Sequence, residues 1–117
     1  MTKPSVWTEM HRVPIRVSSM HIATGRAGDC YACPVALALM EAVGGEWAVS
    51  DAMGVIVAQE LRTGFQTKLP HPVLRFVSDF DSARTVQPFS FDLDLPLALL
   101  PVTLLPGPFN TARKCGF

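Results

Sequence analysis

Apolar and polar positions alternate most regularly late in the chain, from Phe89 to Leu95. The apolar side chains of this run fall on one face of a strand and the polar ones on the other, which predicts a strand with one face in solvent. Val13–Val17 alternates over a shorter stretch, and Pro14 suits an edge strand because proline has no N–H to donate.

Two stretches predict helices. Pro34–Val43 consists of good helix formers, begins with a proline suited to the first helical position and is followed by Gly44-Gly45. It is apolar nearly all round, which predicts a buried helix. A second helix opens at Pro70 or Pro72, because apolar residues then recur at helical spacing at Val73, Phe76, Val77 and Phe80.

Shorter elements fill the intervening chain. Glu46–Ser50 and Val55–Ala58 predict two strands joined by a hairpin loop at Asp51–Gly54. Phe65–Leu69 predicts a further strand, and Met20–Thr24 one or two helical turns capped by Ser18 or Ser19.

These elements predict an α+β fold with a small, mostly antiparallel sheet of four to five strands and two helices packed on one face. Their periodicities place one set of side chains together in the core: Leu37, Met40, Phe76, Phe80, Phe89 and Phe91.

The length of 117 residues, 49% of them apolar, predicts one globular domain. We expect a flexible N-terminal arm at 1–12, the α+β domain at 13–95 and a Pro/Leu-rich C-terminal tail at 96–117. No apolar stretch is long enough to span a membrane, and no secretory signal is visible, so we expect a cytoplasmic protein.

Charge composition disfavours one class of partner. Ten Lys and Arg residues balance ten Asp and Glu residues, and no basic run occurs. Nucleic-acid binding relies on clustered cations that neutralise phosphates, so direct binding of DNA or RNA is not expected.

Cys30-x-x-Cys33 is the one chemically suggestive spacing. Structural zinc needs four ligands, so this pair is half a site, and the remainder would come from His11, His21, His71 or Cys115. A thiol-active pair is a second interpretation, because a helix N-terminus lowers the pKa of a thiol there. The favoured interpretation is structural: Cys33 caps a buried helix and Cys30 lies in a loop, with no metal and no cofactor.

Other candidate groups favour structural roles. Asp29 suits a turn before the helix, His21 a satisfied structural site and Trp47 the core, while Asp92 and Asp94 keep a strand face soluble. No nucleophile elbow, phosphate loop or zinc-protease motif occurs, so we expect no catalytic residue and no enzymatic activity.

The tail is the candidate contact surface, because exposed apolar surface on a small protein usually marks an interaction site. Its predicted partner-binding residues are Leu97, Leu99, Leu100, Leu104, Leu105 and Phe109. The tail docks on a host protein or protein complex, on a second copy of the chain to give a homodimer, or back on its own domain; the sequence does not choose among these.

Four segments together resemble a family of small uncharacterised bacteriophage and prophage proteins: Val13–Val17, Gly28–Leu39, Phe76–Asp81 and Val86–Phe91. The resemblance covers about Val13 to Leu95 and carries no catalytic assignment. It implies a phage accessory protein in the host cytoplasm that binds a host protein, such as a component of a CRISPR–Cas defence system. The alternative is a small zinc-stabilised or thiol-active domain that uses Cys30 and Cys33.

Overall fold

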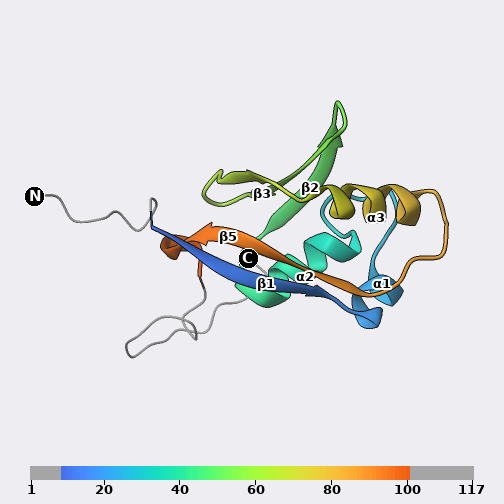
Figure 1. Cartoon of the computed structure of the whole chain (residues 1–117), viewed down its shortest axis with the longest axis horizontal. Coiled ribbons are helices and arrows are strands. Elements are labelled where there is room, and N and C mark those ends of the chain that lie inside the picture. Colours follow the sequence, from blue (N-terminus) through green and yellow to red (C-terminus); the bar gives the residue numbers. More distant parts are fainter. Residues whose placement is uncertain (1–8, 101–117) are drawn as a thin grey trace, which may run out of the picture.

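The computed structural model describes residues 9–100, with Ala52 as backbone alone (Figure 1). Helices and antiparallel strands make an α+β fold, as the sequence predicted. In chain order the elements are β1 (Met10–Val17), α1 (Ser19–Thr24), α2 (Pro34–Val43), β2 (Trp47–Ala52), β3 (Val55–Glu60), β4 (Gln66–Lys68), α3 (His71–Asp81), β5 (Phe89–Pro96) and the 3-10 helix η1 (Leu97–Leu99).

The strands form two sheets where the sequence suggested one. β1 pairs with β5 in a two-stranded ribbon, and β2, β3 and β4 form a three-stranded sheet, all antiparallel. In the ribbon, Pro14 lies opposite Asp92 and Pro96 opposite Met10. Beside Pro96, Leu97 N–H donates to the carbonyl of Glu9, and hydrogen-bonded and non-hydrogen-bonded pairs alternate along the ribbon. Both prolines therefore fall in pairs that exchange no backbone hydrogen bonds, where a missing N–H costs nothing.

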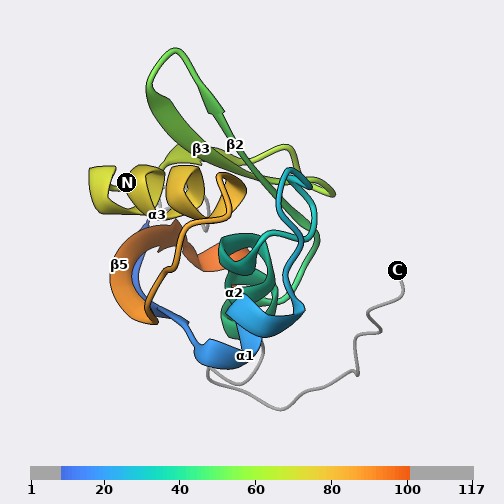
Figure 2. The same ribbon diagram turned by 90° about the vertical axis from the view of Figure 1, so that its right-hand side faces the viewer.

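Helix α2 explains the two sheets. It packs on β1 of the ribbon and on β2 of the larger sheet, so it lies between them (Figure 2). Its bounds are those predicted, and residues on several sides of it are buried, including Val35, Ala36, Ala38, Leu39 and Val43. A helix that is apolar nearly all round needs apolar partners on more than one side, and a single sheet covers only one.

Helix α3 packs on β3 and is amphipathic, as its spacing predicted. Aromatic rings join α3 to β5. The ring centroids of Phe76 and Phe89 lie 4.7 Å apart, and those of Phe89 and Phe91 lie 5.8 Å apart. Of the predicted core set, Phe76 is buried and most others are partly buried against the core. The exception is Leu37, which is half-buried, while Leu39 on the same helix is fully buried.

The β2–β3 hairpin projects from the rest of the molecule in both views (Figures 1 and 2). Its turn is shorter than the predicted four-residue loop, because Ala52 pairs with Val55 and only Met53 and Gly54 lie between them. Both turn residues have positive φ, +55° and +79°, as a type I′ turn requires.

The base of the hairpin is fixed by Glu60, a residue that is only 3% exposed. Its carboxylate accepts the backbone N–H groups of Glu46 and Thr63 at 3.0 and 2.9 Å and the Thr63 hydroxyl at 2.8 Å. Gly45 allows this approach, since a Cβ there would lie 2.8 Å from Glu60 Oε2. Opposite Glu60, Trp47 is fully buried, as predicted, and its Nε1–H donates to the carbonyl of Gly44 at 2.8 Å.

Candidate functional site

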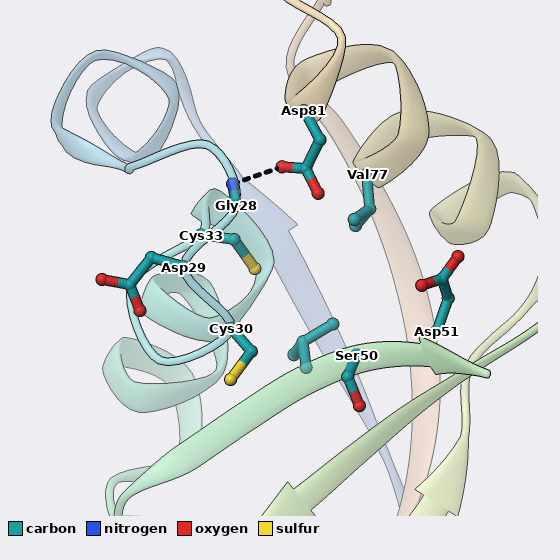
Figure 3. Close-up of a pocket in the computed structure, with 9 residues that line it drawn as sticks. Gly28, Asp29, Cys30, Cys33, Ser50, Asp51, Val77 and Asp81 are labelled. Carbon is teal, nitrogen blue, oxygen red and sulfur yellow. Dashed lines mark hydrogen bonds between the residues drawn. The ribbon is translucent and has the colours of Figure 1, made fainter.

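A pocket of about 180 Å³ lies between the loop that precedes α2, strand β2 and helix α3 (Figure 3). It brings together both cysteines of the C-x-x-C spacing and three carboxylates that are far apart in the sequence. Its lining residues are Gly28, Asp29, Cys30, Cys33, Val49, Ser50, Asp51, Val77 and Asp81.

Cys33 is the N-cap of α2, as predicted, and its side chain is buried. Its Sγ accepts the backbone N–H of Ala36 at 3.5 Å. Burial raises the pKa of the Cys33 thiol, and the nearby Asp81 and Cys30 raise it as well. Hydrogen bonds from Ala36 and Val35 lower the pKa, but the net shift is upward. The predicted lowering by the helix terminus is therefore outweighed, and the thiol stays protonated near neutral pH, which makes it a weak nucleophile.

Cys30 lies in the turn before α2, where Asp29 sets the local conformation. Ala32 N–H donates to the carbonyl of Asp29 at 3.1 Å, and Tyr31 N–H donates to Asp29 Oδ1 at 3.0 Å, which confirms Asp29 as a turn residue. The carbonyl of Cys30 accepts Val49 N–H at 2.9 Å, so this turn is tied directly to β2.

Two further carboxylates, Asp51 and Asp81, reach the pocket from β2 and from the end of α3 (Figure 3). Asp81 Oδ1 accepts Gly28 N–H at 2.9 Å, which ties α3 to the loop. Among residues 9–100, no group of three or more His, Cys, Asp or Glu side chains is arranged to hold a metal ion. The alternative of a zinc centre at Cys30 and Cys33 therefore gains no ligands from this part of the chain, and Cys115 lies outside the described residues.

His21 joins α1 to α2 through contacts that the sequence did not predict. Its Nδ1 accepts the backbone N–H of Ser18 at 2.9 Å, which leaves Nε2 to carry the proton and to donate to Glu41 Oε1 at 2.5 Å. Ser18 Oγ accepts His21 N–H at 3.3 Å, which completes a capping box. Ser18 Oγ also lies 3.1 Å from His21 Nδ1, so Ser18, His21 and Glu41 resemble a catalytic triad in composition. Because Nδ1 also accepts the backbone N–H of Ser18, these contacts together form the N-terminal cap of α1.

The tip of the β2–β3 hairpin carries the most exposed large apolar side chain of the described residues. Met53 is 99% exposed, and its neighbour across the turn, Val55, is also exposed. The positive φ of Met53 is a conformation that Asn, Asp or Gly adopts more readily. The sequence signal was the Met53-Gly54 pair inside the predicted hairpin, but periodicity could not show that the hairpin projects.

The predicted contact residues of the tail divide between two parts of the chain. Leu97 and Leu99 are half-buried and packed against the core, and Leu100 is only 9% exposed. The first turn of the tail thus packs on its own domain. Leu104, Leu105 and Phe109 lie outside the described residues, so their part in partner binding stays a prediction.

Within residues 9–100, no helix has the length and apolar character needed to cross a membrane. Comparison of the chain with protein-family models, with curated proteins and with solved structures finds no match.

Proposed function

We propose that this chain is a non-enzymatic protein that acts by binding another protein, and that the tip of the β2–β3 hairpin is part of its contact surface. The observation that carries the proposal is Met53, a flexible apolar side chain presented 99% exposed at the end of a projecting hairpin. Methionine is enriched at protein interfaces, and moving such a side chain from water into an apolar pocket contributes roughly 1.5–3 kcal/mol.

The backbone at the tip strengthens this argument. A residue with a Cβ costs about 1–2 kcal/mol in the left-handed conformation, and Met53 adopts it with φ +55°. Because its side chain is almost wholly in solvent, Met53 gains little packing within the chain to offset that cost. A strained backbone conformation that is not offset by packing of the side chain is a reason to look for a function at that residue.

Three groups that chemistry could use are engaged in holding the fold, which supports contact over catalysis. The Cys33 thiol is buried and protonated, and the acceptor nitrogen of His21 is occupied by the backbone of Ser18. Glu60 accepts hydrogen bonds from Glu46 and Thr63, which lie on either side of the hairpin. Each of these groups would have to leave its structural partners before it took part in a reaction.

The resemblance to phage and prophage proteins supplies the class of partner. It favours a host protein in the bacterial cytoplasm, and we propose a component of a defence system such as CRISPR–Cas, whose inhibition needs only a tight contact. The partner surface would offer an apolar pocket that accepts the Met53 side chain, surrounded by groups that tolerate Asp51 beside it.

Site-specific crosslinking in the full chain tests this proposal. A photoreactive benzoylphenylalanine is placed at Met53 and, as a matched control, at Met20, which is also exposed, at 67%, but lies on α1. In cells with an active CRISPR–Cas system, irradiation should link position 53 to one defence protein and leave position 20 unlinked. Equal labelling at both positions, or a partner captured only from position 20, would contradict the hairpin as the contact surface.

A further inference from the structure

The Cys30 and Cys33 side chains line the pocket but take no part in the proposed contact at the hairpin tip. Both are free thiols, Cys30 half-buried and Cys33 buried, and both line the same cavity (Figure 3). From this juxtaposition we propose that Cys30 and Cys33 form a reversible intramolecular disulfide, which makes the pocket a redox-sensitive site that reacts with low-molecular-weight disulfides.

The backbone brings the two cysteines within reach of each other. The hydrogen bond from Ala32 N–H to the carbonyl of Asp29 closes a turn that contains Cys30, and Cys33 follows directly as the helix cap. A Cys-x-x-Cys pair at a helix N-terminus is the spacing that redox-active disulfides use, and a disulfide spans Cα atoms about 4.4–6.8 Å apart. The charge of Cys30 is also felt at Cys33, where it raises the pKa of that thiol.

The difference in exposure assigns the order of the two steps. The more accessible Cys30, as its thiolate, attacks one sulfur of the small disulfide, and the S–S bond of that molecule breaks to release one thiolate. Cys33 then loses its proton to solvent and attacks Cys30 Sγ, which expels the second small thiolate. The two cysteine thiols are oxidised, the small disulfide is reduced to two thiols, and the two protons lost by the cysteines are taken up by the released thiolates.

Two structural links would carry the change beyond the cysteines. Cys33 Sγ would give up some or all of its hydrogen bond with Ala36 N–H, which caps α2. The carbonyl of Cys30 holds Val49 N–H, so rearrangement of the turn acts on β2, one strand of the projecting hairpin. The thiol pair is therefore linked through Val49 to one strand of the hairpin that carries the proposed contact surface. The disulfide itself does not depend on that function.

The test uses the folded full chain with Cys115→Ser, because the sequence holds three cysteines and this change leaves only the pair. Oxidised glutathione should remove both free thiols and lower the intact mass by two hydrogen atoms, without dimer formation, and dithiothreitol should restore both thiols. Cys33→Ser in the same background should stop at a glutathione adduct on Cys30. Serine is a good helix N-cap, so that variant keeps the cap of α2.

Cys30→Ser provides the second arm and should react far more slowly, since only the buried thiol remains. The proposal is overturned if both thiols of the Cys115→Ser chain survive excess oxidised glutathione. It is equally overturned if that chain stops at the glutathione adduct, as Cys33→Ser does, or if the oxidised product is a disulfide-linked dimer.

Discussion

The base and the tip of the β2–β3 hairpin differ in how their side chains are supported. At the base, Trp47 is fully buried and Glu60 accepts hydrogen bonds from Glu46 and Thr63. At the tip, Met53 stands in solvent on a backbone conformation that disfavours it. The same pair of strands is therefore firmly held at one end and presented freely at the other.

A second non-glycine residue with positive φ shows why strain alone does not mark a contact site. Ala83 also has positive φ, +62°, just after α3. There the conformation closes the helix: Ala83 N–H donates to the carbonyl of Phe80 and Arg84 N–H to the carbonyl of Asp79, the pattern of a Schellman motif. The strained conformation of Ala83 allows hydrogen bonds that satisfy the last carbonyl groups of α3. At Met53 the turn needs a positive φ, but nothing in the turn needs a methionine side chain.

Trp47→Ala should have the largest effect, because it empties the buried base of the hairpin. The loss of a fully buried indole and of its hydrogen bond to Gly44 predicts a cost of about 3–5 kcal/mol in the free energy of unfolding. Chemical denaturation measures it. A loss below about 1 kcal/mol would show that the base is not the anchored end.

Glu60→Gln should cost about 1–3 kcal/mol at neutral pH, because a carboxylate that accepts several hydrogen bonds is replaced by an amide with one acceptor oxygen. Burial raises the pKa of Glu60, but hydrogen bonds from Glu46, Thr63 and Arg62 together lower it by more than burial raises it. The pKa in the folded state therefore lies below its ordinary 4.5.

The sign of the pH dependence follows from that lowered pKa. The carboxylate's contribution is complete above pH 4.5 and is lost as the pH falls through the folded-state value. The difference in unfolding free energy between wild type and Glu60→Gln should therefore shrink in acid. A difference that stays constant or widens from neutral pH to below pH 4.5 would refute this account of the base.

Met53→Asn should stabilise the fold by about 1 kcal/mol, because asparagine tolerates the left-handed conformation and suits the first position of a type I′ turn. Thermal or chemical unfolding measures the change. Met20→Asn is the matched control and should not stabilise, since Met20 is also exposed but lies in the regular backbone of α1. An unfolding free energy lowered by Met53→Asn would mean that the methionine supports the hairpin.

Ala83→Gly should give the smallest effect, a stabilisation of about 0.5 kcal/mol, because relief of the positive φ is partly offset by the greater freedom of glycine in the unfolded chain. Its binding to the crosslinked partner should match that of wild type. A loss of binding here would show that the end of α3, rather than the hairpin tip, makes the contact.

Local signals predicted much of the fold. Proline at the start and glycine after the end fixed both bounds of α2, and the apolar spacing from Val73 identified α3. The division into two sheets was not predictable, because the pairing of β1 with β5 joins residues about 80 positions apart and depends on where α2 lies.

The same limit applies to the candidate site. The C-x-x-C spacing and the cap at Cys33 were visible in the sequence, but the pKa of Cys33 depends on burial and on Asp81 of α3. The contact of His21 with Glu41 joins two helices, and no periodicity within either one reports it. Exposure at Met53 likewise follows from the projection of the hairpin rather than from its turn residues alone.

The most direct test of contact through the hairpin tip measures two properties of Met53→Asn in one preparation: the unfolding free energy and the affinity for the partner crosslinked at position 53. The account predicts opposite signs, with a fold more stable than wild type and an affinity weaker by about tenfold or more, which corresponds to about 1.4 kcal/mol. A variant that is more stable and binds the partner as tightly as wild type would contradict it.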